Sequence, residues 1–385
     1  RSRAAPECGA AHQRTMTDRV YAVVTGGGTS GHVLPALAVA DALVAAGHDP
    51  ATIRYLGARR GVETRLLPVT PYPYEFLDVV GMQRRLTRAN LGFVPKMVRS
   101  TRAAVALLRE WRPRVVVSVG GYASMPAVFA ARRLGVPVVV VSYDRTPGRA
   151  SRLSARSAAA CAVAFEDSPL PRAENTGAPD RQAILDLDRS SEERRRTARD
   201  RLGIESERFM VAVMGGSLGS GVLNDAIARY LAGHRDDDHL AVRQITGERF
   251  VEGVAHVDGA VVHQVVGYES DMAGVYQACD VIIGRGGAST VHEVAVTGTP
   301  AILVPWAASA DDHQTDNVRW LSEVGGAVML RESELDRLAD TLDALRADPS
   351  RRDALAAAAL RRGEVHRSGA LAGLIERVAI ASSPS

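Results

Sequence analysis

The sequence of 385 residues has little cysteine, little net charge and no long hydrophobic run. Its three cysteines, Cys8, Cys161 and Cys279, lie far apart and form no CxxC pair, which argues against a disulfide framework or a zinc site and fits a reducing cytoplasm. The formal net charge of +3 gives no bulk argument for nucleic-acid binding. No uncharged apolar stretch reaches the roughly 18 residues that a membrane-spanning helix needs. The chain is long enough for about two globular domains.

The N-terminus also lacks the features of a targeting segment. Residues 1–20 are basic but contain no apolar central run, which argues against a signal peptide. Met16 stands shortly before the first predicted strand. We therefore expect residues 1–15 to be a disordered or non-native extension.

The sequence does contain a regular alternation of predicted strands and helices. Continuous apolar runs of strand length, typical of parallel strands covered on both faces, occupy 20–25, 53–57, 114–121, 137–143 and 300–306. Segments 209–231 and 281–298 each read as a strand, a glycine turn and a helix. Two such series predict an α/β fold with two doubly wound, Rossmann-like domains facing a central cleft. Ligands of such sheets bind at the carboxyl ends of the strands, so the site is expected in this cleft.

Composition places the domain boundaries. We expect an N-terminal domain at 16–178, a C-terminal domain at 179–363, and a C-terminal helix and tail at 364–385 that packs back on the first domain. The connection between the domains lies near 175–184. The highly charged segment 188–203 is interpreted as a solvated helix that introduces the second domain.

The glycine turns indicate a nucleotide ligand. Residues 26–31 satisfy GxGxxG, but the second strand ends in Gly57 to Arg60 without the acidic residue that would bind a dinucleotide ribose, which argues against NAD. The second half offers a glycine turn before a helix at 284–290, with Glu293 in that helix, and polar groups at 311–317. Any one of these turns alone could be purely structural. Together with the turn at 215–220, they predict a nucleotide-diphosphate-sugar pocket.

Six motifs in collinear order, from about residue 20 to 325, carry a resemblance to a known family. They read GGTSGH at 27–32, GGYASMP at 120–126, GAPDR at 177–181, GGSLGS at 215–220, RGGASTVHE at 285–293 and DDHQTDN at 311–317. The chain resembles the peptidoglycan transferases that add N-acetylglucosamine from UDP-GlcNAc to undecaprenyl-diphosphate-MurNAc-pentapeptide, converting lipid I to lipid II. The resemblance implies a glycosyltransferase-B fold, an inverting and metal-independent hexosyl transfer with a β-1,4 product, and a role in cell-wall biogenesis, cell shape and cell division. It also implies a peripheral enzyme at the cytoplasmic face of the plasma membrane, with an N-terminal acceptor domain and a C-terminal UDP-sugar domain.

The resemblance also assigns binding residues. Donor contacts are expected from Thr29, Ser30, Gly31, Arg181, Ser217, Gly267, Arg285, Gly287, Ala288, Glu293, His313, Gln314 and Asn317. The acceptor diphosphate is expected at Gly27, Gly28, Gly31, Gly121, Tyr122 and Ser124. Among the donor-binding residues, Glu293 would bind the ribose, and Gln314 with Asn317 would recognise the GlcNAc. No cofactor is expected, and no metal either, since the acidic runs at 186–188 and 236–238 lie in polar contexts rather than at strand ends.

Catalysis is expected from His32 and Asp144. His32 opens a helix, whose dipole disfavours an imidazolium, so His32 is the candidate general base. The alternative is that His32 caps the helix or binds acceptor phosphate. The family has HExN where this chain has Val141 to Asp144, which leaves the acceptor identity open. Asp144 could tune the acceptor site or be the base itself, and a carboxylate near His32 would raise the pKa of the histidine.

A basic and apolar segment is the candidate membrane contact. Residues 79–109 contain no Asp or Glu. The residues expected at an anionic membrane surface are Arg84, Arg85, Leu86, Arg88, Leu91, Phe93 and Lys96. The alternative is a solvated loop and an amphipathic helix packed on the core. Nucleic acid is disfavoured because no aromatic platform accompanies the charges.

Three other functions stay open at this stage. A paralogue could keep UDP-GlcNAc and the fold but glycosylate a different lipid or metabolite. A UDP-GlcNAc 2-epimerase would share the architecture, although it would not need the basic apolar segment. A non-enzymatic nucleotide-sugar binder is the last alternative.

Overall fold

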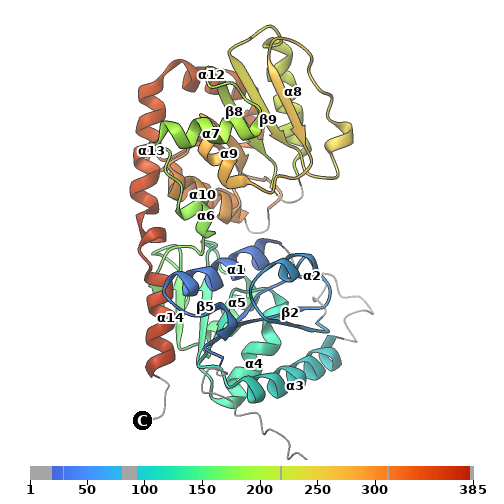
Figure 1. The fold of residues 1–385 in the computed structure, drawn as a ribbon, viewed down its shortest axis with the longest axis vertical. Helices are drawn as coiled ribbons and strands as arrows, with labels where there is room; N and C mark the ends of the chain where they lie inside the picture. The colour runs from blue at the N-terminus through green and yellow to red at the C-terminus, as the bar shows by residue number, and fades with distance from the viewer. Residues whose placement is uncertain (1–19, 29, 80–92, 217–218, 310–311, 382–385) are drawn as a thin grey trace, which may run out of the picture.

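The computed structural model describes residues 20–28, 30–79, 93–216, 219–309 and 312–381, which form two α/β domains stacked along the long axis of the molecule (Figure 1). The first contains a seven-stranded sheet in the order β3-β2-β1-β4-β5-β6-β7, and the second a six-stranded sheet in the order β10-β9-β8-β11-β12-β13. Neighbouring strands pair in parallel in both sheets. The predicted pair of doubly wound domains is confirmed.

The N-terminal sheet consists of β1 (Ala22–Thr25), β2 (Ile53–Ala58), β3 (Tyr74–Leu77), β4 (Val115–Ser118), β5 (Val138–Ser142), β6 (Ala160–Val163) and β7 (Ala173–Asn175). Its helices are α1 (Ser30–Ala45), α2 (Glu63–Leu66), α3 (Phe93–Trp111), α4 (Met125–Leu134) and α5 (Arg149–Ala155). The single-turn helix η5 (Tyr122–Ser124) follows β4.

The C-terminal sheet consists of β8 (Phe209–Met214), β9 (Leu240–Ile245), β10 (Val262–Val266), β11 (Val281–Arg285), β12 (Ala301–Val304) and β13 (Val328–Met329). Its helices are α6 (Gln182–Leu185), α7 (Glu192–Leu202), α8 (Gly221–Gly233), α9 (Met272–Ala278), α10 (Ala288–Thr297), α11 (His313–Ser322), α12 (Leu338–Ala347) and α13 (Pro349–Gly363). The last helix, α14 (Ala370–Ala381), returns to the first domain.

The central strands are apolar along their whole length because both faces of the sheet are covered. Every residue of β1 and β4 is buried. Successive side chains point to opposite faces, so Val24 belongs to the same core as Val39 of α1, while Val23 belongs to the core that contains Leu108 of α3 and Ala131 of α4.

The strand orders place two glycine loops at the switch point of each sheet. In the first sheet the order reverses between β1 and β4, which are followed by residues 26–28 and 119–121. In the second it reverses between β8 and β11, which are followed by residues 215–216 and 286–287. Ligands of doubly wound sheets bind at such a point, so the site is expected beside these four loops.

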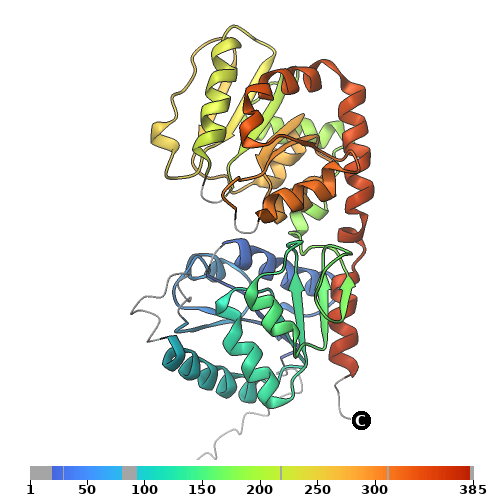
Figure 2. The same ribbon diagram turned by 180° about the vertical axis from the view of Figure 1, so that it is seen from behind.

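The C-terminal helices connect the two domains. Figure 2 shows α13 and α14 running one after the other along one edge of the molecule, from the second domain to the first. Helix α14 packs against α1, β4 and β6. Its Glu376 is 2.9 Å from Nε2 of His48, and its Arg377 pairs with Glu174. Helix α14 therefore packs on the N-terminal domain.

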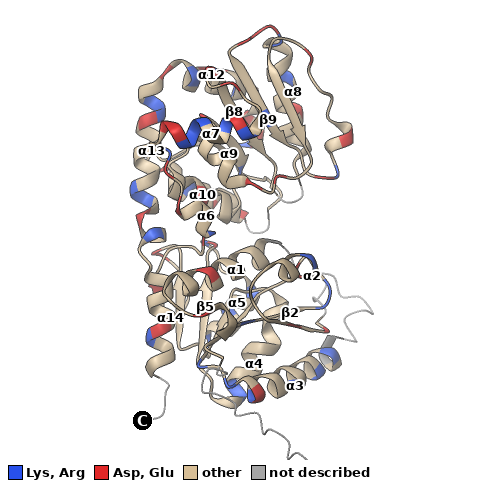
Figure 3. Ribbon diagram, viewed as in Figure 1, with Lys and Arg blue, Asp and Glu red and all other residues tan. Residues whose placement is uncertain are grey.

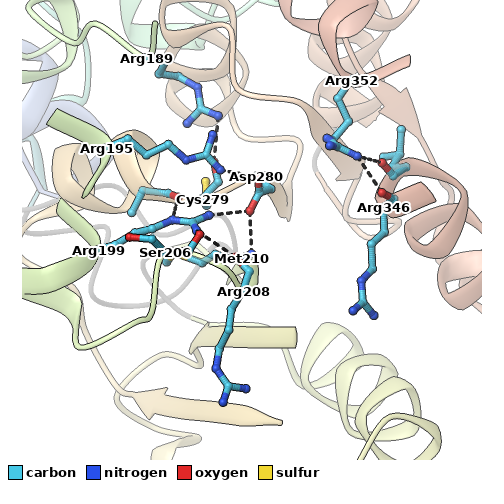
Figure 4. A network of polar contacts seen from close by, with 12 residues as sticks. Arg189, Arg195, Arg199, Ser206, Arg208, Met210, Cys279, Asp280, Arg346 and Arg352 are labelled. Atoms are coloured by element: carbon cyan, nitrogen blue, oxygen red, sulfur yellow. Dashed lines mark hydrogen bonds and ion pairs between the residues drawn. The ribbon is translucent and has the colours of Figure 1, made fainter. Parts of the chain in front are cut away.

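The expectation of a fully solvated helix at 188–203 is wrong in part. Helix α7 is mostly exposed, but Arg199 is buried and its Nη2 lies 2.7 Å from Oδ2 of Asp280 (Figure 4). The same guanidinium donates to the carbonyl of Ala278, and Arg189 donates to that of Cys279. These bonds replace hydration of the buried arginines and fasten the start of the domain to its sheet.

Candidate functional site

The two glycine loops of the first domain pack directly on one another. Gly121 has a positive φ of 76°, and a Cβ there would lie 2.6 Å from the carbonyl oxygen of Gly27. A Cβ on Gly120 would lie 3.4 Å from Cδ2 of His32, so the imidazole rests against the second loop. Ser124 Oγ donates to the carbonyl of Gly121. The structure thus brings most of the residues assigned to the acceptor diphosphate to one edge of the sheet.

The Gly28 amide does not point to a ligand. Its N–H donates to Oε1 of Glu63 over 3.2 Å, so this amide is already used within the protein. The expected role of Gly28 in holding a diphosphate through its N–H therefore has no support in this loop conformation.

His32 has an environment that favours the neutral imidazole. Burial lowers the pKa of His32, while the carboxylates of Asp144 and Glu63 act in the opposite direction. As expected, the carboxylate of Asp144 acts to raise the pKa of His32, but the lowering by burial is larger. A neutral imidazole can accept a proton at neutral pH, as a general base must.

Asp144 lies where the two domains meet. Burial raises the pKa of its carboxyl group, and the neighbouring His313, a hydrogen bond with Asn317 and the nearby His32 oppose that rise. The next amide, that of Arg145, donates to Oδ1 of Asn317 over 3.3 Å. Asp144 of the first domain is thus near two residues of α11 that the motifs assign to the donor, and it also neighbours His32.

The residues assigned to the donor are connected to one another. Arg181 Nη2 lies 3.0 Å from Oε1 of Glu293, and the hydroxyl of Tyr276 donates to Oε2 of the same carboxylate over 3.0 Å. Asn317 Nδ2 donates to the carbonyl of Gly286, and Gln314 Oε1 accepts from the amide of Trp306. The first of these contacts joins the interdomain connection to α10.

The glycine turn before α10 has an open position at its end. A Cβ on Gly287 would meet no atom within 4 Å, and Ala288 begins a helix of ten residues. Arg285, in contrast, is engaged internally, since its Nη2 lies 2.6 Å from Oε1 of Glu332. A Cβ on Gly267 would lie 3.1 Å from Oε2 of Glu248. The helix start, rather than the Arg285 side chain, is what the second domain can present to an anion.

A cavity of about 480 Å³ is formed by both domains and includes Arg145, the residue after Asp144, in its lining. It combines guanidinium groups, carboxylates and prolines: Arg145, Thr146, Pro147, Arg152, Asp167, Pro169, Asp316, Arg319 and Glu323. Two ion pairs lie within it, Arg145 with Asp167 and Arg319 with Asp316. Neither His32 nor Asp144 is among the residues that line this cavity.

Some of the residues assigned to donor binding or to membrane contact lie outside the described residues. This applies to Thr29, Ser217, Arg84, Arg85, Leu86, Arg88 and Leu91, and to the side chains of Ser30 and Phe93. Of the assigned membrane contacts, Lys96 lies on α3 and is half-buried. Figure 3 shows further basic positions along this helix. Arg99 and Arg102 of α3 are exposed.

The described ranges contain neither a candidate metal cluster nor a membrane-spanning helix. Among them, no three His, Cys, Asp or Glu side chains are grouped so that they could hold a metal ion. None of the described helices combines the length and apolar character needed to cross a membrane.

Sequence patterns did not single out four residues that support the site. The Tyr143 hydroxyl donates to the carbonyl of Gly31, and the Tyr143 carbonyl lies 2.9 Å from Nε2 of His292 in the other domain. His366 Nδ1 accepts from the amide of Ala178 over 2.6 Å. Tyr276 and these three residues act through contacts between distant segments, for which a local motif gives no signal.

Comparison with known proteins gives a consistent result. The profile of the glycosyltransferase family 28 N-terminal domain matches residues 22–163, and that of the family 28 C-terminal domain matches residues 210–368. A UDP-N-acetylglucosamine–N-acetylmuramyl-(pentapeptide) pyrophosphoryl-undecaprenol N-acetylglucosamine transferase from a Nocardioides species is 39% identical, over 88% of this chain and 92% of its own length. The transferase of the same description from Desulforudis audaxviator is 33% identical, over 93% and 98%.

Solved structures agree on the architecture. The crystal structure of Acinetobacter baumannii MurG superposes with a TM-score of 0.70 and 26% identity, covering 94% of this chain and 99% of that one. The glycotransferase of kitacinnamycin has a TM-score of 0.65 at 16% identity, covering 94% and 99%, a likeness that extends to the fold alone.

Proposed function

Because the chain belongs to the family of UDP-N-acetylglucosamine–N-acetylmuramyl-(pentapeptide) pyrophosphoryl-undecaprenol N-acetylglucosamine transferases, we propose that it transfers N-acetylglucosamine from UDP-GlcNAc to the muramyl sugar of the lipid-linked pentapeptide. The observation that carries the proposal is that Asp144, a neighbour of His32 in the first domain, is also hydrogen-bonded to Asn317 of the second. A proton acceptor of the first domain is thereby close to the donor-side residues of the second.

Transfer with inversion needs one in-line displacement. The acceptor hydroxyl oxygen bonds to the anomeric carbon of GlcNAc as the bond from that carbon to the UDP oxygen breaks, and the electron pair leaves on the β-phosphate. The hydroxyl proton passes to the neutral imidazole of His32, and Asp144 stabilises the imidazolium that forms. The lowered pKa of His32 keeps it ready to accept that proton.

The donor binds to the second domain in this proposal. Glu293 accepts the ribose hydroxyls, because a carboxylate has about four lone-pair positions and only two are used by Arg181 and Tyr276. The leaving diphosphate is stabilised by the free amides at the start of α10 and by Arg181. These groups supply the positive potential that a metal ion supplies in other enzymes.

A second acceptor class has one specific observation in its favour. The segment that carries HExN in the family is Val141 to Asp144 here, and its Tyr143 hydroxyl is bonded to the carbonyl of Gly31. A carboxylate at position 144 accepts hydrogen bonds where an amide would also donate them. The alternative is therefore transfer of the same sugar to a different lipid or metabolite.

We also propose peripheral binding to an anionic membrane at its cytoplasmic face. On α3, Arg99 and Arg102 are exposed, and Val98, the residue before Arg99, is 46% exposed. Arg99 pairs with Asp78, which reduces its charge effect, whereas Lys96 and Arg102 extend the basic surface next to the assigned segment. Basic and apolar side chains in this mixture favour lipid headgroups.

Turnover of labelled UDP-GlcNAc with lipid I and with a panel of other lipid and metabolite acceptors tests the function. We expect a lipid-linked disaccharide from lipid I. The variant Asp144→Asn should increase preference for lipid I over other acceptors and leave UDP binding unchanged. Turnover that requires another acceptor would favour the second class, and UDP-sugar isomerisation without acceptor would refute transfer.

A further inference from the structure

Glu63 is a completely buried carboxylate beneath the first glycine loop. It is the first residue of α2, and its Oε1 accepts from the amides of Gly28 and Ala58, each over 3.2 Å. The first bond holds the loop after β1, and the second holds the end of β2. Glu63 therefore ties together two neighbouring strand ends at the edge where His32 lies.

The loop passes so close to this side chain that a larger residue would not fit. A Cβ on Gly27 would lie 2.5 Å from Oε1 of Glu63. The close approach of the carboxylate is therefore a sufficient reason for glycine at position 27, whether or not a ligand also binds there. The loop and Glu63 form one packed unit.

The charge of Glu63 is not needed for these two bonds. A neutral amide oxygen could accept from both backbone groups equally well. Within the described part of the chain, Oε2 has no hydrogen-bond partner, and burying a carboxylate with so few partners is unfavourable. The two backbone bonds alone therefore do not account for a negative charge at this position.

A reason for the charge is found in the groups that face His32. The carboxylates of Glu63, from α2, and Asp144, after β5, both favour protonated His32, and burial disfavours it. Two phenols also contact the loop among the described residues: the Tyr55 hydroxyl donates to the carbonyl of Gly26 and the Tyr143 hydroxyl to that of Gly31. Burial raises the pKa of both phenols, so they stay neutral.

We propose that Glu63 is a positioning residue for sugar transfer, which fixes the glycine loop that precedes His32 and supplies negative charge that stabilises the imidazolium formed when the acceptor hydroxyl loses its proton. This inference rests on the proposed function. Glu63 contacts the loop and not the reacting atoms.

The variant Glu63→Gln keeps an acceptor for both amides and removes the charge. We expect the acid limb of the pH profile of kcat/KM to move to lower pH by about half a unit or more, because a lost negative charge lowers the pKa of His32. We expect kcat near pH 7 to fall by about threefold or more, because half a pKa unit of lost imidazolium stabilisation corresponds to that factor. Glu75→Gln removes an exposed carboxylate of the same domain and serves as the matched control.

The imidazole titration of His32, followed by NMR in the same variants, gives a readout independent of turnover. A lower pKa in Glu63→Gln but not in Glu75→Gln supports the inference even if lipid I is the wrong acceptor. An unchanged pKa and an unchanged pH profile, with or without a loss of thermal stability, would overturn it. If Glu63→Gln fails to fold, the titration is made in Glu63→Met, which also removes the charge and is close in size to glutamate, with the same two outcomes.

Discussion

Replacing Glu293 by alanine tests the donor site and has a magnitude that follows from its contacts. The carboxylate is bonded to Arg181 and to the buried Tyr276, and it is proposed to accept the ribose hydroxyls. A hydrogen bond to a charged group contributes about 1.5–3 kcal/mol. Glu293→Ala should therefore weaken UDP binding by about 10- to 150-fold.

The same change should also lower stability. The Arg181 side chain is 32% exposed and that of Glu293 is 11% exposed, so the pair lies between a surface ion pair and a buried one. After solvent screening is taken into account, we expect a loss of about 1–3 kcal/mol in the free energy of unfolding.

Isothermal titration calorimetry with UDP measures the first effect and urea unfolding the second. Glu252→Ala, which removes an exposed carboxylate of the same domain, is the control and should change neither. Wild-type UDP affinity in a folded Glu293→Ala protein would refute the assignment of the ribose to this carboxylate.

Three further predictions concern metal, membrane and pH. Turnover should persist in EDTA, because helix amides and Arg181 stabilise the leaving diphosphate; complete loss that Mg²⁺ or Mn²⁺ restores would show that these groups are insufficient. Replacing Arg84, Arg85 and Arg88 by Glu should abolish sedimentation with anionic vesicles, and high salt should weaken binding of the wild type. Equal sedimentation of both proteins would show that this segment is a solvated loop that does not bind the membrane. Burial lowers the pKa of His292 to about 4 in the folded protein. As the pH falls from about 6.5 to 4, His292 therefore becomes protonated in the unfolded chain but stays neutral in the folded one, which favours unfolding. Up to about 3 kcal/mol of stability should be lost over this window, and a urea midpoint in His292→Gln with the same pH dependence as the wild type would exclude His292 as the cause.

The sequence predicts those parts of the fold and site that are encoded locally. The buried strand β1 and its glycine turn are continuous in the chain, and the parallel order of β1, β4 and β5 is enough to expect Asp144 near His32. Short edge strands were missed, because β3 lies among prolines and aromatic residues and has only four residues.

Contacts between distant segments could not be predicted. Glu63 stands alone in a polar stretch of sequence, and its burial becomes apparent only when the loop at Gly27 is folded over it. The bond between Tyr143 and His292 joins residues of different domains. The pairing of Arg181 with Glu293 likewise depends on how the interdomain connection meets α10.

The turnover number of His32→Ala with saturating UDP-GlcNAc and lipid I tests the central claim most directly. If His32 accepts the proton of the attacking hydroxyl, kcat should fall by roughly 10²- to 10⁴-fold. UDP affinity should stay at the wild-type value, because the donor-binding carboxylate lies in the other domain. A folded His32→Ala protein with wild-type turnover would contradict the mechanism, whatever the role of Asp144.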